Sequence, residues 1–392
     1  MNILRRATTR QLAIAIVAVI VIAAGSAVAL AGRGGPKPPH RSLAAALHRA
    51  AEARPVQGVA ARVKLTDNLI GTGTLPTSSP LLTGATGRIW VGGGKIRLEL
   101  QSDAGDTEIG YDGSKVTVYD VASGTAYVLP ISHHAHPGGA PSRHHGIPSV
   151  AEIRKALARI AGKVDLSGAI PGDVAGQPAY TVRVSPRHSG GLLGSVELAW
   201  DANHGVPLRI AVYSKTDSSP VLALTVTDVT YGPVASSALA VPLAPGTKIV
   251  KVHAPSGADH GTATGREAHR PAVAGTAAVA RAVSFPLSAP SSLVGLPRRS
   301  VRLVDFAGSK GALAVYGRGL GAVGVLEQQV PASGSKRSPL AALPGVSIAG
   351  ASGHELDTAL GTLIQFDRGG VRYTVVGSLP PAAAEAAARA IG

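Results

Sequence analysis

The chain has 392 residues, contains no cysteine and carries a formal net charge of +15 at pH 7. The lack of cysteine excludes a disulfide framework, a thiolate nucleophile, a thiolate metal site and a cysteine-linked lipid. The positive charge suits anionic lipid or an anionic wall polymer, whereas the aromatic content of 3% speaks against a base-stacking surface for nucleic acid.

The most apolar segment is Leu12–Ala31, which follows three arginines among the first ten residues. At about 20 residues, it is long enough to cross a hydrocarbon core as a helix. It exceeds the usual apolar region of a cleaved signal, although Ala27–Ala29 and Ala29–Ala31 both offer cleavage sites. We predict a single-pass anchor within residues 1–32, with the bulk of the chain outside the cytoplasm. Secretion after signal cleavage is the alternative.

A Gly/Pro-rich stretch, residues 33–41, is predicted to tether the rest of the chain to this segment. Ser42 then suits the N-cap of a helix that continues to about Ala53. Leu43 and Leu47 lie on one face of that helix.

Four segments alternate between apolar and polar residues in the manner of half-buried strands. They are Arg62–Leu65, Lys95–Leu100, Ser195–Trp200 and Leu208–Tyr213. Asp112-Gly113 adds a hairpin signal, because an Asp-Gly turn suits the twist of antiparallel strands. The pattern predicts an antiparallel sheet with one buried and one solvated face.

A further helix is predicted within this strand-rich region, and both of its ends are marked. Ser149 and Glu152 form a capping-box pattern, and Gly162 is typical of a helix end. The apolar stripe between them consists of Val150, Ile153, Leu157 and Ile160. A long sheet with a few amphipathic helices against one face is an α+β arrangement.

Three motifs of this region resemble the LolA-like lipoprotein-carrier superfamily. Gly110–Asp120 is similar to its Asp-Gly hairpin, and Gly176–Val182 is similar to its strand with an Ala-Tyr pair. Val196–Arg209 resembles its Glu-Leu-Trp hairpin, except that His204 replaces the usual threonine and Trp200 stands one place later.

The resemblance implies, for residues 42–254, an incomplete antiparallel β-barrel that holds acyl chains beneath lid helices. The lid residues would be Leu43, Leu47, Ile153 and Leu157. The apolar lining would consist of Val63, Leu65, Ile96, Leu98, Leu100, Val116, Val118, Val196, Leu198, Ile210, Val212, Leu222 and Leu224. The alternative is that the same residues pack as an ordinary filled core.

Histidines cluster at two places in one loop, namely His133, His134 and His136, and then His144 and His145. Such a cluster could bind zinc, nickel or copper. However, no carboxylate or cysteine accompanies the imidazoles, and no helix sets their spacing. We therefore predict an exposed loop without a metal site; protonation at mildly acidic pH would strengthen its attraction to anionic lipid.

Residues 319–324 match the dinucleotide-binding pattern G-x-G-x-x-G, but Val325–Val330 reads as a strand where that fold needs a helix. We predict a glycine-rich hairpin instead. The G-x-S-x-G and H-E-x-x-H motifs are both absent from the sequence. We therefore predict a non-enzymatic protein without a cofactor.

Residues 255–282 are predicted to be a linker, and residues 283–392 a smaller α+β domain. The domain would contain a strand at Leu313–Tyr316, a hairpin around Asp367–Gly370 and a final helix at Ala382–Ile391. This arrangement resembles the second domain of RseB/MucB-type sigma-factor regulators, with an actinobacterial-type architecture. In those proteins the domain docks a membrane anti-sigma factor.

The sequence thus leads to two functional hypotheses of different class. The first is an extracytoplasmic carrier or envelope sensor that binds a lipid or the acyl group of a lipoprotein. The second is an interaction module without a ligand cavity, which regulates a membrane anti-sigma factor through its C-terminal domain. An extracytoplasmic hydrolase has the least support.

Overall fold

The computed structural model describes residues 35–70, 81, 84–131, 148–187, 190–252, 273–306, 309–330 and 343–391. The predicted membrane anchor and the histidine cluster lie outside these residues. Within them, no helix is both long and apolar enough to cross a bilayer.

The described chain forms two large β-sheets, and the first contains 13 strands within these residues. Its main path runs in the order β13-β6-β5-β4-β3-β2-β1-β12-β11-β10-β9-β7, and β8 also pairs with β9. The strands are β1 (Gly58–Asp67), β2 (Ala85–Gly92), β3 (Lys95–Ser102), β4 (Gly105–Tyr111), β5 (Lys115–Asp120), β6 (Thr125–Pro130), β7 (Val164–Leu166), β8 (Ile170–Val174), β9 (Gln177–Pro186), β10 (Leu193–Asp201), β11 (Pro207–Ser214), β12 (Pro220–Tyr231) and β13 (Lys248–Lys251).

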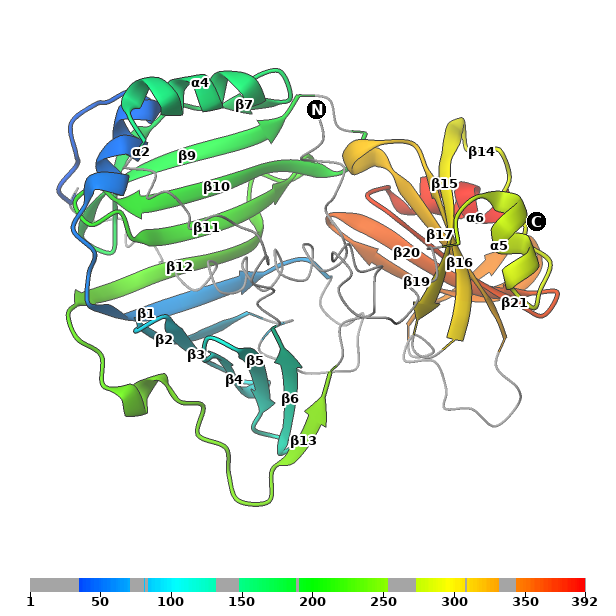
Figure 1. Ribbon diagram of the computed structural model, residues 1–392, viewed down its shortest axis with the longest axis horizontal. Helices are drawn as coiled ribbons and strands as arrows, with labels where there is room; N and C mark the ends of the chain where they lie inside the picture. The colour runs from blue at the N-terminus through cyan, green and yellow to red at the C-terminus, as the bar shows by residue number, and fades with distance from the viewer. Residues whose placement is uncertain are drawn as a thin grey trace, which may run out of the picture.

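The first sheet is curled, as Figure 1 shows, from β9 and its neighbour β7 at the upper edge to β6 and β13 at the lower edge. Two helices, α2 (Leu43–Glu52) and α4 (Val150–Ile160), lie at the upper edge. Neighbouring strands such as β1 and β12 are antiparallel, whereas β13 joins β6 in parallel. The α+β prediction with a curved sheet and helices on one side is confirmed.

Both of these helices begin where the sequence indicates. The Ser42 side chain accepts a hydrogen bond from the Ala45 backbone N–H. Ser149 and Glu152 form the complete reciprocal capping box, which satisfies backbone donors at the start of α4. The start of each helix is therefore specified by local sequence.

The second sheet has eight strands in the order β14-β15-β16-β17-β21-β20-β19-β18. Helices α5 (Thr276–Ala282) and α6 (Pro381–Arg389) pack against it. Two short 3-10 turns also occur, at Ser236–Leu239 between β12 and β13 of the first sheet and at Gly319–Gly321 between β16 and β17. The strands are β14 (Ser292–Leu293), β15 (Leu296–Phe306), β16 (Ser309–Tyr316), β17 (Val323–Gln329), β18 (Gly345–Ile348), β19 (Ala351–Thr358), β20 (Gly361–Arg368) and β21 (Val371–Gly377).

The glycine-rich segment lies in the connection between β16 and β17, so the prediction of a hairpin is confirmed. Helix α5 occupies the end of the segment that the sequence assigns to a linker. It is ordered there because Val279 is fully buried in the core of the second sheet. The last helix starts at Pro381, one residue earlier than predicted, with proline in the first turn as is common for helix starts.

Candidate functional site

One face of the first sheet carries all thirteen residues that the sequence predicts as an apolar lining, and we call it the inner face. The strand register places them there, because residues paired across antiparallel strands point to the same side. Val63 pairs with Val226, Ile89 with Leu98, and Leu98 with Ile109. At the other end of the sheet, Leu198 pairs with Ile210, and Ile210 pairs with Leu224.

The inner face is covered unevenly. Five of the thirteen residues are buried, namely Val63, Leu98, Leu100, Val116 and Leu224. The other eight are only half-buried, namely Leu65, Ile96, Val118, Val196, Leu198, Ile210, Val212 and Leu222. Most of the half-buried residues lie on β10, β11 and β12, so this part of the apolar face keeps contact with solvent.

The helices α2 and α4 pack over the β9–β10 end of the inner face. Leu43 belongs to a buried cluster with Tyr180 and Trp200, and Leu47 and Leu157 pack against that cluster. Ile153 is half-buried. The two helices are also joined to each other, since the His48 ring nitrogen Nδ1 lies 2.8 Å from the carbonyl oxygen of Pro148. The structure therefore places the predicted lid over part of the predicted lining.

Three further residues lie on the inner face beneath the helices and were not predicted as lining: Tyr180, Val182 and Trp200. Strand alternation puts Trp200 on the same side as Val196 and Leu198, but neither it nor the quoted motifs indicate that helices cover these residues. The pairing of β10 with β11 is irregular here: Ala199 pairs with Arg209, but the next residue, Trp200, pairs with Pro207. Trp200 is 3% exposed, and its indole Nε1 has no hydrogen-bond partner in the described part of the chain.

A fully buried carboxylate, Asp201, ends β10 directly beside Trp200. It accepts hydrogen bonds from the Tyr231 hydroxyl at 2.7 Å and from the backbone N–H groups of Asn203 and His204. Burial raises the pKa of Asp201, but the hydrogen bonds outweigh burial, and its pKa falls below the ordinary 3.8. Asp201 thus holds the β10–β11 turn in one conformation.

The same contacts give no activated nucleophile. The Nδ1 atom of His204 lies 3.1 Å from Asp201, and its ring packs against Tyr231 in a tilted arrangement, with 4.1 Å between centroids. Burial and the hydrogen bond to Asp201 raise the pKa of Tyr231, so its phenol keeps its proton. The cluster is therefore suited to holding structure and not to acid–base chemistry.

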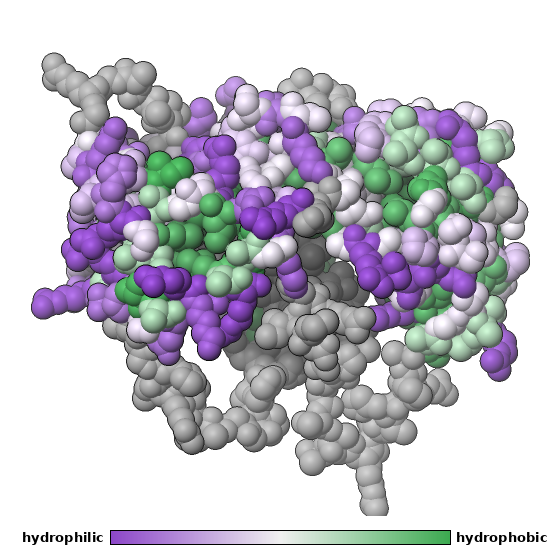
Figure 2. Space-filling view, turned by 90° about the horizontal axis from the view of Figure 1, so that it is seen from above, coloured by the Kyte–Doolittle hydropathy of each residue, from purple (hydrophilic) through white to green (hydrophobic). Residues whose placement is uncertain are grey.

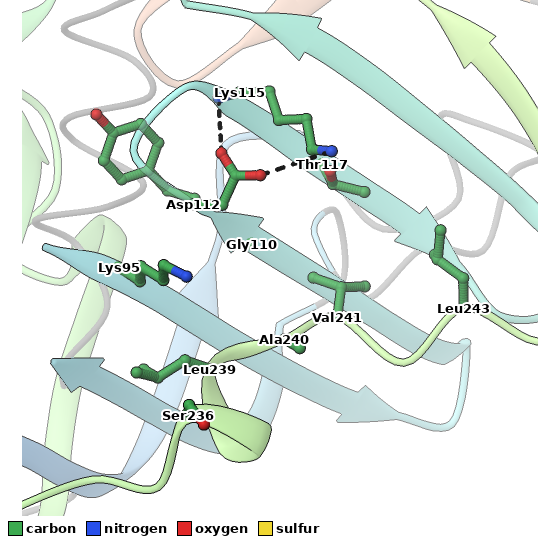
Figure 3. Close-up of a pocket in the computed structure, with 11 residues that line it drawn as sticks. Lys95, Gly110, Asp112, Lys115, Thr117, Ser236, Leu239, Ala240, Val241 and Leu243 are labelled. Carbon is green, nitrogen blue, oxygen red and sulfur yellow. Dashed lines mark hydrogen bonds and ion pairs between the residues drawn. The ribbon is translucent and has the colours of Figure 1, made fainter. Parts of the chain in front are cut away.

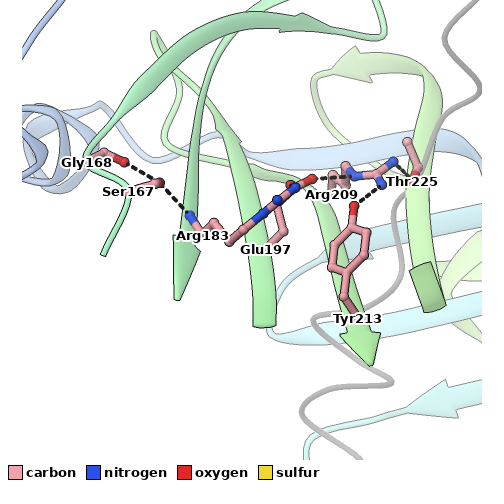
Figure 4. A network of polar contacts seen from close by, with 7 residues as sticks. All are labelled: Ser167, Gly168, Arg183, Glu197, Arg209, Tyr213 and Thr225. Atoms are coloured by element: carbon pink, nitrogen blue, oxygen red, sulfur yellow. Dashed lines mark hydrogen bonds and ion pairs between the residues drawn. The ribbon is translucent and has the colours of Figure 1, made fainter. Parts of the chain in front are cut away.

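The opposite, outer face of β9–β12 is covered by a polar network (Figure 4). Glu197 accepts hydrogen bonds from Arg183 at 2.8 Å and from Arg209 at 3.0 Å. Arg209 also donates to Thr225 and Tyr213. These charge-assisted bonds connect neighbouring strands and complete the alternation of apolar inner and polar outer positions.

A pocket of about 300 Å³ lies on the outer face between β3–β5 and the 3-10 turn at Ser236–Leu239 (Figure 3). Lys95, Lys115 and Asp112 are among its polar lining residues. Hydrogen bonds, first that from the Ser114 backbone, lower the pKa of Asp112 to about 2. Gly110 is needed here because a Cβ atom would lie 2.3 Å from Val241. Gly110, the first residue of the hairpin motif, therefore lets the segment that follows β12 lie close to the sheet.

A second, shallower pocket of about 410 Å³ lies at the ends of β1–β3 and is lined partly by Asp67, Asn68 and Gln101. Its side chains are mostly polar, and it lies away from the helices. The described residues contain no group of three or more histidines, aspartates or glutamates that could hold a metal ion.

No family model matches the chain, and no curated protein matches it. It is similar to the solved structure of MucB in complex with MucA(peri), at 17% identity over 89% of this chain and 98% of that chain, with a TM-score of 0.43. The MucA/MucB complex of Pseudomonas aeruginosa gives 18% identity, the same coverage and the same TM-score. A LolA superfamily protein from Nitrosomonas europaea gives 12% identity over 52% of this chain and 99% of that chain, with a TM-score of 0.21.

Proposed function

We propose that the chain is a non-catalytic, extracytoplasmic protein whose inner face binds the acyl chain of a lipid or of a lipoprotein. The observation that carries the proposal is the group of eight half-buried apolar residues on the inner face. Contact of such a surface with water costs about 25 cal/mol per Å². An acyl chain along β10–β12 would remove that contact for the five of these residues that lie on the three strands, and it needs no specific polar partners.

The unpartnered Nε1 of Trp200 supports the same proposal. A buried donor without an acceptor is unfavourable by about 1–3 kcal/mol. An ester or carboxyl oxygen of a bound lipid could accept its hydrogen bond while the hydrocarbon follows the strands. Trp200 belongs to the apolar cluster beneath α2 and α4, and Leu198, one of the half-buried residues, packs against that cluster.

The competing proposal is a protein-binding module that regulates a membrane anti-sigma factor through the second sheet. On that proposal the inner face of the first sheet is only a core. The two proposals differ in one measurable property, which is whether the inner face takes up an acyl chain.

The chain offers a direct test because it has only two tryptophans. Trp90 lies on the outer face, where the Arg97 guanidinium sits 4.9 Å from its ring centroid, and Trp200 lies on the inner face. In the Trp90→Phe variant of the full chain, a lipid with brominated acyl chains should quench the fluorescence of Trp200. In the matched Trp200→Phe variant, the same lipid should leave Trp90 unquenched.

Equal quenching of both tryptophans, or of neither, would refute acyl binding at the inner face. Native mass spectrometry of the purified chain provides a second, independent readout, since a bound lipid should appear as a defined added mass. A Leu222→Glu variant should lose that mass, because a carboxylate in an apolar site loses its hydration. Thr227→Glu, on an exposed position of the same strand, is the control and should retain it.

A further inference from the structure

The upper edge of the first sheet has a surface that the proposed acyl site does not use. It consists of α4 and of β7 and β8, two short strands that pair with β9 on the side away from β10. We call it the α4 rim. None of the residues of α4 is buried, although the helix is strongly amphipathic. Ile160 is 44% exposed at the end of α4, and Ile170 is 50% exposed in β8.

Basic residues outnumber acidic ones among the exposed positions of the rim. Arg154, Lys155, Arg159 and Lys163 are all exposed, and none of them forms an ion pair with another described residue. The rim has three acidic residues. Glu152 caps α4, Asp165 pairs with Arg187 at 2.6 Å, and Asp173 of β8 is exposed. The rim therefore carries unpaired positive charge.

Figure 2 looks down on this edge of the molecule. It shows hydrophobic residues in both halves of the molecule; those in the left half, over the helix-bearing part of the first sheet, are bordered by hydrophilic residues. Apolar side chains bordered by basic ones are typical of a helix that lies in a membrane interface.

The path of the chain brings the predicted anchor to the same edge. The first described residue, Gly35, lies against Asp173 of β8, and the Tyr180 hydroxyl donates a 2.6 Å hydrogen bond to the carbonyl oxygen of Pro39. Residues 35–41 thus follow the rim, with Pro38 buried, and do not serve as a free tether. Four peptide units separate Ala31 from Gly35, and they span at most about 14 Å.

We infer that the α4 rim docks on the surface of an anionic bilayer, with Ile160 at the lipid interface and the basic residues against the headgroups. Charge complementarity and the short connection to the predicted anchor both place lipid at this surface. Anionic headgroups attract basic residues that lie within about 10 Å, and salt screens this attraction. The inference is independent of whether the inner face binds an acyl chain.

The lack of cysteine allows a site-specific test in the full chain. We would label Ile160→Cys with an environment-sensitive fluorophore and reconstitute the protein in phosphatidylcholine vesicles with or without phosphatidylglycerol. Lipids carrying a nitroxide near the headgroup should quench the label strongly when phosphatidylglycerol is present, and 0.5 M salt should reduce the quenching. Val376→Cys, 48% exposed on the second sheet, is the position control and should remain unquenched.

Charge variants decide whether lipid headgroups hold the rim. Arg154→Gln, Lys155→Gln and Arg159→Gln together should reduce quenching at position 160 to the level at position 376. Arg299→Gln, Arg302→Gln and Lys310→Gln remove the same number of exposed charges from the second sheet and should leave the quenching intact. Quenching that is equal at the two positions, or equal in the two lipids, or unchanged by the α4 substitutions, would overturn the inference. Circular dichroism of each variant verifies that it is folded.

Discussion

Asp201 shows at the scale of one residue how this fold stabilises a turn. Its carboxylate is completely buried, which is costly for a charge unless hydrogen bonds replace its hydration. The turn that it holds includes Gly205, with φ of +67°. A Cβ atom at Gly205 would lie 2.5 Å from the Ala50 carbonyl oxygen, so this turn also lets α2 come close to the sheet.

The first prediction concerns this carboxylate. Asp201→Asn should lower the free energy of unfolding by about 1–3 kcal/mol at pH 7, because the amide cannot accept all of the hydrogen bonds. The pKa of Asp201 is lower in the folded chain than its ordinary 3.8. The ionised carboxylate therefore stabilises the folded chain above pH 3.8, and this stabilisation is lost as the pH falls through the pKa of the folded state. The difference between wild type and variant should therefore shrink at pH 3. Urea unfolding at both pH values measures it.

An exposed aspartate provides the control for this prediction. Asp228→Asn, on β12, should change the free energy of unfolding by less than about 0.5 kcal/mol at pH 7. Equal destabilisation by Asp201→Asn at both pH values would contradict the prediction, because it would mean that the partners of Asp201 do not stabilise its charged form.

At the scale of elements, the inner face is one continuous surface with two degrees of coverage. Leu98 is 2% exposed and lies between Ile89 and Ile109 on the neighbouring strands. Leu222 occupies the same face on β12 and is half-buried. The strands are alike in pattern, so the packing of other elements decides which part of the face is filled.

The second prediction compares these two leucines. Leu98→Ala should lower the free energy of unfolding by about 2–5 kcal/mol, since closely packed neighbours cannot fill the space left behind. Leu222→Ala should cost no more than about 2 kcal/mol, because fewer atoms surround the side chain. Denaturant unfolding of both variants gives the comparison. Equal costs near the upper end would indicate a filled core along the whole face and would favour the interaction-module proposal.

The third prediction concerns the start of α4. Ser149→Ala removes the side-chain acceptor for the Glu152 backbone N–H and should destabilise the helix by about 1 kcal/mol. Hydrogen exchange in α4 should then become about fivefold faster, with little change in the buried strands. Ser149→Asn retains an acceptor and should exchange nearly as slowly as wild type.

At the scale of the whole molecule, the two sheets meet at a closely packed joint. The Leu192 backbone N–H donates a 2.8 Å hydrogen bond to the Ser378 hydroxyl, which in turn donates to the Leu360 carbonyl oxygen. A Cβ atom at Gly321 would lie 2.9 Å from the Cα atom of Gly190. The glycine-rich turn therefore allows two backbone segments, one from each half, to approach closely.

The fourth prediction tests this joint. Gly321→Ala should loosen the contact between the halves, because neither backbone can move away without breaking the neighbouring hydrogen bonds. Small-angle scattering should show a larger radius of gyration, and calorimetry should show the two sheets unfolding more independently. Gly345→Ala is the control, since a Cβ atom there meets nothing within 4 Å and the backbone needs no positive φ. An unchanged scattering profile for Gly321→Ala would contradict the prediction.

The sequence alone determined the elements of this protein whose pattern is local. Alternation along Lys95–Leu100 and Leu208–Tyr213 predicts strands with the correct face inward, and the Ser149–Glu152 pair predicts the start of α4, because both depend on neighbours along the chain.

Tertiary structure alone decided the features that depend on distant segments meeting. Trp200 could not be placed beneath α2 and α4 from its own surroundings in sequence, because its burial depends on helices that pack across from other parts of the chain. The same holds for Gly321: its motif only matches the dinucleotide-binding pattern, whereas its small size allows a close backbone contact with Gly190. Burial and close approach are properties of the assembled sheets, and periodicity along a strand does not contain them.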